Sequence, residues 1–240
     1  MIQILDDASA LANAAAKLFA DEARKAVALR GRFLVLLAGG ETPRHTYELL
    51  GRQPYRSSVP WSAVHFFWGD DRCVPLRDAR SNFTMARHAI LDHLPIQREQ
   101  LHPIYCIGAT PQKAAAEYEL GLKGFFAGAQ PVFDLALLGL GEDGHTASLL
   151  PGSSSLQEAK RWTAVSKRPE EKFSRVTLTV PVLNQARRIV FLVSGENKAS
   201  VLQHILQDTG SPTPYPAQLI RPKNGQVDWL VDRAASRFLT

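Results

Sequence analysis

Cysteine is scarce in this 240-residue chain, which contains only Cys73 and Cys106. The two lie far apart and form no C-x-x-C motif, so the sequence predicts neither a disulfide framework nor a zinc cluster. Reduced thiols, the usual state in the cytoplasm, are the preferred interpretation.

Long apolar runs and dense basic runs are also missing. No apolar stretch is long enough to cross a membrane, and Asp6, Asp7 and Asp21 lie where a signal peptide would be basic and then apolar. The net charge is +5, yet Lys and Arg are scattered, with no cluster beyond pairs such as Arg187-Arg188. We therefore expect a cytoplasmic protein with no membrane or nucleic-acid partner, whose positive charge suits a small anionic substrate.

What is present is the composition of an ordinary globular protein, with 45% hydrophobic and 21% charged residues. Apolar runs alternate with helical periodicities, which predicts a single domain over residues 1–240. We expect an α/β fold: a Rossmann-like parallel sheet with helices on both faces. The patterns predict helices over residues 8–30, 44–50, 81–94, 111–126 and 199–206, and strands over 33–37, 64–68, 135–140, 162–165, 175–180, 188–194 and 227–231.

Polar residues follow four of the predicted strands, where parallel sheets bind ligands. After residues 33–37 comes Ala38-Gly39-Gly40-Glu41-Thr42-Pro43, a glycine turn that leads into a helix. Backbone amides and the helix dipole favour an anion at such a turn. The segment is neither a Walker A loop nor G-x-G-x-x-G, so it does not indicate a nucleotide. A simple turn with Pro43 at the first helical position explains the local sequence equally well.

Charged side chains follow two further strands. Asp70 and Arg72 come directly after residues 64–68, and Lys198 follows residues 188–194 beside Gly195. An arginine there suits bidentate recognition of a phosphate or carboxylate, whereas Asp70 can hold a substrate hydroxyl or assist proton transfer. Surface ion pairs or solvated charges are the alternative interpretation for each residue alone.

The segment Gly141-Glu-Asp-Gly-His-Thr146 breaks the apolar run of residues 135–140, and we expect a new helix to follow it. Asp143 and His145 flank a glycine, so a carboxylate can orient an imidazole that acts as a general base. By itself the tripeptide favours the simpler interpretation, a helix cap beside a surface histidine. No G-x-S-x-G elbow occurs, which disfavours a covalent acyl-enzyme.

Five segments together resemble the 6-phosphogluconolactonase family. They run in the family's order from about Phe33 to Lys198: AGGETPRHTYELL, HFFWGDDRCVP with SNFTMAR, LLGLGEDGHTASLLPG, RVTLTVPVLN and VSGENKA. The resemblance implies a fold shared with glucosamine-6-phosphate deaminases and ribose-5-phosphate isomerases. It also implies hydrolysis of 6-phospho-D-glucono-1,5-lactone to 6-phosphogluconate, in the oxidative pentose phosphate pathway, without a metal or cofactor. We expect a monomer or weak homodimer.

The same resemblance implies roles for individual residues. His145 matches the family's general base and Asp143 its neighbour in the D-G-H motif. The phosphosugar-binding positions match Gly39, Gly40, Thr42, Arg72 and Lys198, while Asp70 and Arg175 match less securely assigned site residues.

The chain departs from the family's pattern in the glycine turn, where members often have Ser-Gly-Gly-Ser-Thr-Pro. Ala38 and Glu41 replace two hydroxyl residues, which brings an anionic side chain close to the expected phosphate. Asp71 stands in place of a common Glu. We therefore expect the backbone amides of the turn to matter more than its side chains.

A lactone carbonyl needs an activated water, donors for the developing oxyanion, and a proton for the leaving ring oxygen. We expect His145 to move the protons, Asp143 to fix its tautomer, and glycine amides near Gly141 or Gly39 to receive the oxyanion. Two alternatives remain: an isomerase or deaminase of a hexosamine 6-phosphate with Asp70 as base, and a sugar-phosphate sensor without turnover.

Overall fold

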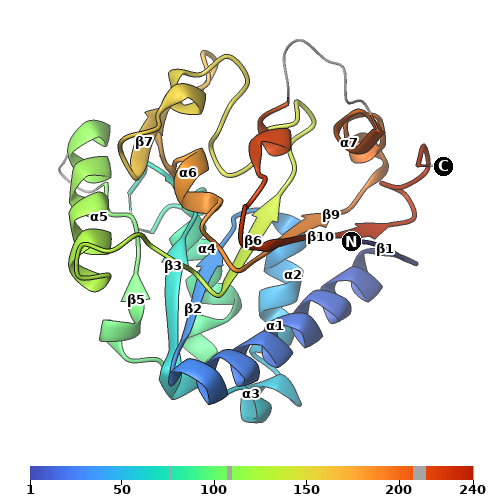
Figure 1. Cartoon of the computed structure of the whole chain (residues 1–240). Coiled ribbons are helices and arrows are strands. Elements are labelled where there is room, and N and C mark those ends of the chain that lie inside the picture. The colour runs from blue at the N-terminus through green and yellow to red at the C-terminus, as the bar shows by residue number, and fades with distance from the viewer. Residues whose placement is uncertain (76, 107–109, 208–214, 240) are drawn as a thin grey trace.

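The computed structural model describes residues 1–75, 77–106, 110–207 and 215–239, which form a seven-stranded parallel sheet flanked by helices (Figure 1). The strands lie in the order β1-β10-β9-β6-β2-β3-β5. They are β1 (Ile2–Leu5), β2 (Phe33–Leu37), β3 (Val64–Trp68), β5 (Leu101–His102), β6 (Leu135–Gly139), β9 (Arg188–Val193) and β10 (Gln226–Asp232). The predicted parallel α/β architecture is confirmed, and β1 is a strand that the sequence analysis did not predict.

The central strands are continuous apolar runs because both faces of the sheet are covered. All five residues of β2 are buried, and β2 pairs with β3 on one side and β6 on the other. Successive residues of a strand point to opposite faces. On one face, Phe66 stacks on Trp61, which in turn lies against Phe19 of the first long helix. On the other face, Phe67 contacts Phe125.

The helices divide between these two faces. In Figure 1, α1 and α2 lie together below the sheet. Helix α5 lies on the other side, where its last residue, Phe125, contacts Phe67. The helices are α1 (Ala8–Arg30), α2 (Glu41–Leu50), α3 (Tyr55–Ser58), α4 (Asn82–Ala89), α5 (Pro111–Phe125), α6 (Val180–Leu183) and α7 (Ala199–Gln207). The buried face of α1 is a stripe of alanines with Leu11 and Phe19, as an amphipathic covering helix requires.

A second, antiparallel sheet was not predicted. It consists of β4 (Asp70–Arg72), β8 (Arg175–Leu178) and β7 (Thr163–Ser166), in that order. Its register pairs Asp70 with Thr177 and Arg72 with Arg175. The charged residues after β3 therefore continue as a strand rather than a loop, and two arginines distant in sequence become neighbours.

Two predicted helix boundaries and one predicted helix were wrong. Helix α2 begins at Glu41 rather than Arg44, so Pro43 is its third residue. Helix α4 ends at Ala89 because Ile90 leaves the helical backbone at φ −141°, and a short 3-10 turn follows over Leu91–His93. No helix begins directly after Thr146 in the described chain; Thr146 instead forms a β-bridge with Leu149.

The expectation of reduced cysteines was also wrong. Cys73 and Cys106 are joined as a disulfide, with Cα atoms 5.0 Å apart. Parallel pairing of β3 with β5 brings the segments after both strands to the same edge of the sheet. Sequence spacing did not reveal this proximity, because it arises from a crossover connection.

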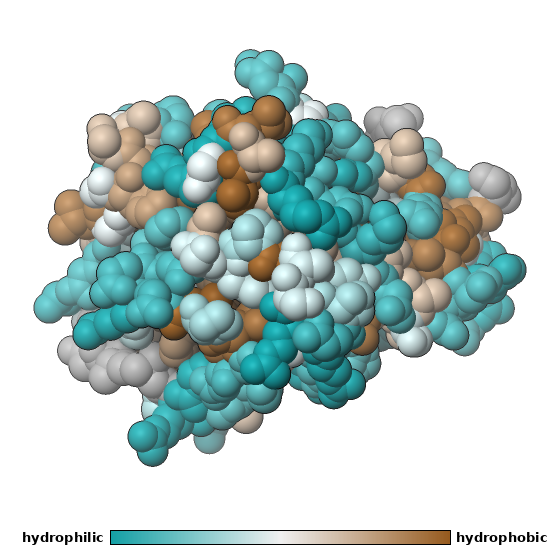
Figure 2. All heavy atoms as spheres, turned by 90° about the horizontal axis from the view of Figure 1, so that it is seen from below, coloured by the Kyte–Doolittle hydropathy of each residue, from teal (hydrophilic) through white to brown (hydrophobic). Residues whose placement is uncertain are grey.

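No helix in the described part of the chain is long and apolar enough to cross a membrane. Viewed from below, the surface is mainly hydrophilic, with separate apolar patches between charged side chains (Figure 2). In the segment 210–216, whose composition is typical of a linker, residues 210–214 lie outside the described residues.

Candidate active site

A cavity of about 220 Å³ lies at the carboxyl ends of β2, β3 and β6, where the sequence predicts the site. Its lining comes from the glycine turn, β4, the start of α4, the segment after β6, β8 and the turn before α7. The lining residues are Ala38, Gly39, Gly40, Asp70, Arg72, Asn82, Gly139, Leu140, Gly141, His145, Thr146, Ala147, Arg175 and Lys198.

Most of the predicted site residues meet in this cavity. The predicted residues that line it are Gly39, Gly40, Asp70, Arg72, His145, Arg175 and Lys198. Thr42 does not line it; this residue is the second of α2, and its carbonyl accepts a hydrogen bond from Thr46. Asp143 also lies outside the lining, beside His145.

The glycine turn allows a close approach between two segments. A Cβ atom on Gly39 would lie 1.9 Å from Oδ1 of Asn82, so only glycine fits against this side chain. No side chain caps the start of α2, which leaves its first backbone amides available to an anion. The carboxylate of Glu41 bonds to Arg44 and its side chain is 77% exposed, so it points away from the cavity.

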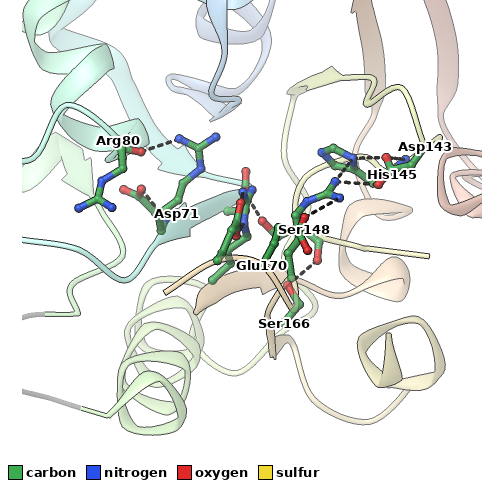
Figure 3. A network of polar contacts seen from close by, with 12 residues as sticks. Asp71, Arg80, Asp143, His145, Ser148, Ser166 and Glu170 are labelled. Carbon is green, nitrogen blue, oxygen red and sulfur yellow. Dashed lines mark hydrogen bonds and ion pairs between the residues drawn. The ribbon is translucent and has the colours of Figure 1, made fainter. Parts of the chain in front are cut away.

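His145 and Asp143 form a hydrogen-bonded pair at the cavity wall. Nδ1 of His145 lies 2.5 Å from Oδ1 of Asp143, and Figure 3 shows the two side chains joined in this way. A Cβ atom on Gly141 would lie 1.9 Å from the same Nδ1, so glycine makes room for the imidazole. With the Nδ1 proton donated to Asp143, the Nε2 atom keeps a lone pair that can accept a proton.

Asp143 is held in its ionised form. Burial acts to raise the pKa of this carboxyl, but hydrogen bonds from His145 and Arg168 outweigh it and lower the pKa to about 2. Nη2 of Arg168 lies 2.7 Å from Oδ2 of Asp143 and 3.0 Å from Nδ1 of His145. Arg168 lies in the charged segment Lys-Arg-Pro-Glu-Glu-Lys of residues 167–172, and nothing in the composition of that segment distinguishes it as a site residue.

Asp70 occupies a different wall and is 5% exposed. Ser148 donates its hydroxyl proton to Oδ2 at 2.5 Å, and Asn82 donates to Oδ1 at 3.2 Å. Asn82 was not predicted as a site residue, although it lies within the motif SNFTMAR. Of the two carboxylates, Asp143 is the one that contacts His145, whereas Asp70 bonds to Ser148 and Asn82.

Of the cations that line the cavity, Arg72 has no salt bridge in the described structure and Lys198 has only a long one. Arg72 donates through Nη1 to the carbonyl of Arg80, while its Nε is buried with no partner among the described residues. The ammonium of Lys198 is 3.8 Å from the exposed carboxylate of Glu142. Arg175, in contrast, is buried and donates to Glu171 through Nε at 2.9 Å.

Asp71 shapes the cavity from beneath. Its carboxylate accepts from the backbone amides of Arg72, Asn82 and Phe83 and from the hydroxyl of Ser81, which ties β4 to the start of α4. Burial raises its pKa to about 6 despite these bonds. The residue positions Arg72 and Asn82 but is absent from the lining.

The cavity thus combines an oriented imidazole, uncapped helix amides and two cations. Such a site can bind an anionic group, remove a proton from water and stabilise a developing oxyanion.

Comparison with known proteins agrees with this geometry. Residues 6–229 match the family model described as glucosamine-6-phosphate isomerases/6-phosphogluconolactonase. A 6-phosphogluconolactonase of Synechocystis is 42% identical over 90% of this chain and 88% of its own length. The human 6-phosphogluconolactonase is 37% identical, over 100% of this chain and 94% of that protein.

Solved structures show the same fold. The 6-phosphogluconolactonase from Trypanosoma cruzi superposes with a TM-score of 0.87 at 31% identity, covering 100% of this chain and 96% of that one. A monomeric glucosamine-6-phosphate deaminase, 21% identical, has a TM-score of 0.82 over 98% of each chain, and its likeness concerns the fold alone. The chain belongs to the glucosamine-6-phosphate isomerase/6-phosphogluconolactonase family.

Proposed function

We propose that this protein hydrolyses 6-phospho-D-glucono-1,5-lactone to 6-phospho-D-gluconate, as a 6-phosphogluconolactonase of the oxidative pentose phosphate pathway. The names of its relatives support the reaction. The observation that supports the chemistry best is His145: one ring nitrogen is bound to Asp143, and the side chain lines a cavity that also contains Arg72 and Lys198.

In this mechanism, His145 takes a proton from water as the water oxygen attacks the lactone carbonyl. The charge that develops on the carbonyl oxygen faces the amides of the glycine turn at the start of α2. The amide of Gly141, considered above for the same role, donates instead to the carbonyl of His145 at 2.8 Å. The tetrahedral intermediate then collapses: the bond from the carbonyl carbon to the ring oxygen breaks, and His145 returns the proton to that oxygen.

Arg72 and Lys198 bind the phosphate in this proposal. Both line the cavity; Arg72 has no salt bridge among the described residues, and Lys198 has a long one, of 3.8 Å, to the exposed Glu142. The guanidinium of Arg175 is bound to Glu171, so Arg175 contributes mainly to the shape of the wall. Asp70, which already accepts two hydrogen bonds, is suited to receive a hydroxyl of the sugar.

A coupled assay tests the proposal. Freshly generated 6-phosphogluconolactone is supplied, and formation of 6-phosphogluconate is followed with 6-phosphogluconate dehydrogenase against the spontaneous rate. We expect turnover well above that background. Release of ammonia from glucosamine 6-phosphate would instead identify a deaminase, and binding of 6-phosphogluconate without turnover would identify a sensor.

We also propose that the protein acts in the cytoplasm as a monomer or weak homodimer, without a cofactor. Light scattering after size exclusion measures the oligomeric state. Thiol titration of the freshly isolated protein measures how much of the Cys73–Cys106 pair is oxidised in the cell.

A further inference from the structure

We infer that Arg168 is a positioning residue that acts on the reacting groups through Asp143. The inference rests on the proposed function, in which His145 is the general base. Arg168 lies in the loop after β7 and influences, through Asp143, whether His145 is protonated. Arg168 is absent from the cavity lining, yet its Nη2 atom lies 2.7 Å from Oδ2 of Asp143.

The hydrogen-bond geometry determines which contacts can exist together. Nδ1 of His145 cannot donate to Asp143 and at the same time accept from Arg168, whose nitrogen atoms are all donors. The shorter contact, 2.5 Å to Asp143, assigns the Nδ1 proton to that bond. Arg168 therefore donates to the other oxygen of Asp143, and its 3.0 Å approach to Nδ1 is an approach of charge rather than a hydrogen bond.

Two consequences follow for catalysis. With both oxygens of Asp143 engaged, the carboxylate cannot rotate, so the imidazole keeps the orientation in which Nε2 is the free acceptor. The positive charge of Arg168 offsets part of the negative charge of Asp143, and it therefore opposes protonation of the imidazole in the resting enzyme. The side chains are partly shielded, with 26% of Arg168 and 22% of His145 exposed, so solvent does not fully screen this effect.

The substitution Arg168→Gln removes the charge. The negative charge of Asp143 is then less compensated, the imidazole accepts a proton at higher pH, and the acidic limb of the kcat/KM profile moves upward by about half to one pH unit. Arg168→Lys retains the charge and keeps the limb near its original pH. Lys167→Gln, on an exposed neighbour in the same loop, is the matched control for net charge.

Other charged groups also face His145, and they are unchanged in these variants. They are Asp143 on its own segment, Asp70 and Arg72 on β4, Arg175 on β8, and Lys198 before α7. Arg168 itself also lies 3.8 Å from the carboxylate of Glu170, which is 67% exposed. A displacement that appears in R168Q and not in K167Q is therefore due to Arg168. Thermal unfolding shows whether each variant is folded, and Arg168→Met serves as a second neutral variant.

A double-mutant cycle tests whether Arg168 acts through Asp143. In the Asp143→Asn background, R168Q should change kcat/KM far less than it does in the wild type. Equal effects in both backgrounds, or a raised KM with an unmoved acidic limb, would overturn the inference and place Arg168 on the substrate. Failure of the proposed function looks different: the wild type itself would not exceed spontaneous hydrolysis.

Discussion

Asp143 and Asp71 are two carboxylates at the same edge of the sheet, and their pKa values are shifted in opposite directions. The side chain of Asp143 is 34% exposed, whereas Asp71 is 2% exposed. Asp143 meets His145 and Arg168, and these partners lower its pKa to about 2 although burial opposes them. Asp71 accepts only from backbone amides and a hydroxyl, and burial raises its pKa to about 6. Charged partners and shallower burial together hold the pKa of Asp143 low, whereas deep burial outweighs the uncharged donors around Asp71.

The difference matches two tasks. In the proposed mechanism, Asp143 supports an imidazole that becomes positively charged during the reaction, so a permanent negative charge is useful there. Asp71 holds β4 against α4 and thereby places Arg72 and Asn82 in the cavity wall.

The largest effect should come from the reactive side. His145→Asn removes the proton acceptor while keeping a polar side chain of similar reach, and we expect kcat to fall by about a hundredfold to ten-thousandfold. The coupled assay measures the fall, with binding of 6-phosphogluconate as the control for an intact pocket. Near-normal turnover would contradict the assignment of His145 as base.

The next largest effect is expected for Arg72, which Asp71 holds in the cavity wall. Arg72→Ala should weaken binding of 6-phosphogluconate by about tenfold to a hundredfold, because a charge-assisted contact to an anion is lost. Isothermal titration calorimetry measures the affinity. Arg77→Ala, at an exposed position, is a control of equal charge change; unchanged affinity in R72A would remove Arg72 from the phosphate site.

The pH dependence of the free energy of unfolding should distinguish Asp71, whose pKa is raised, from Asp143, whose pKa is lowered. The pKa of Asp71 rises from 3.8 to about 6 on folding, so the native state binds a proton more tightly than the unfolded chain. The stability that this proton contributes is complete below about pH 4 and is lost as pH rises through 6.

Asp71→Asn does not titrate, which isolates the effect. Urea unfolding should show the wild type losing about 2 kcal/mol relative to D71N between pH 4 and pH 6. A difference that is constant with pH, or that changes in favour of the wild type, would show that the hydrogen bonds to Asp71 outweigh its burial.

The smallest effect involves a third carboxylate. Glu41 bonds to Arg44 outside the cavity, so Glu41→Ser should change KM by less than about twofold. Steady-state kinetics at low and moderate salt measure it. A severalfold lower KM in E41S would mean that the carboxylate turns toward the substrate phosphate.

Local pattern was sufficient for several elements of this fold. The apolar runs of β2, β3 and β6 and the periodicity of α1 were predicted with nearly correct bounds. Asp143 and His145 were paired in the prediction because they are two residues apart. Sequence could not reveal the antiparallel sheet, since β4 is a short polar segment that becomes a strand only by pairing with β8.

By itself, the sequence determined where the strands end and which reactive side chains stand at those ends, because burial and turn formation depend on neighbouring residues. Tertiary structure alone decided the partners: Ser148 bonds to Asp70 across 78 positions, Arg168 to Asp143 across 25, and Cys73 to Cys106 across 33. Such contacts depend on strand order and register, which bring together segments that no local pattern connects. That is why the sequence singled out His145 as the candidate general base, and only the fold showed which carboxylate and which arginine lie beside it.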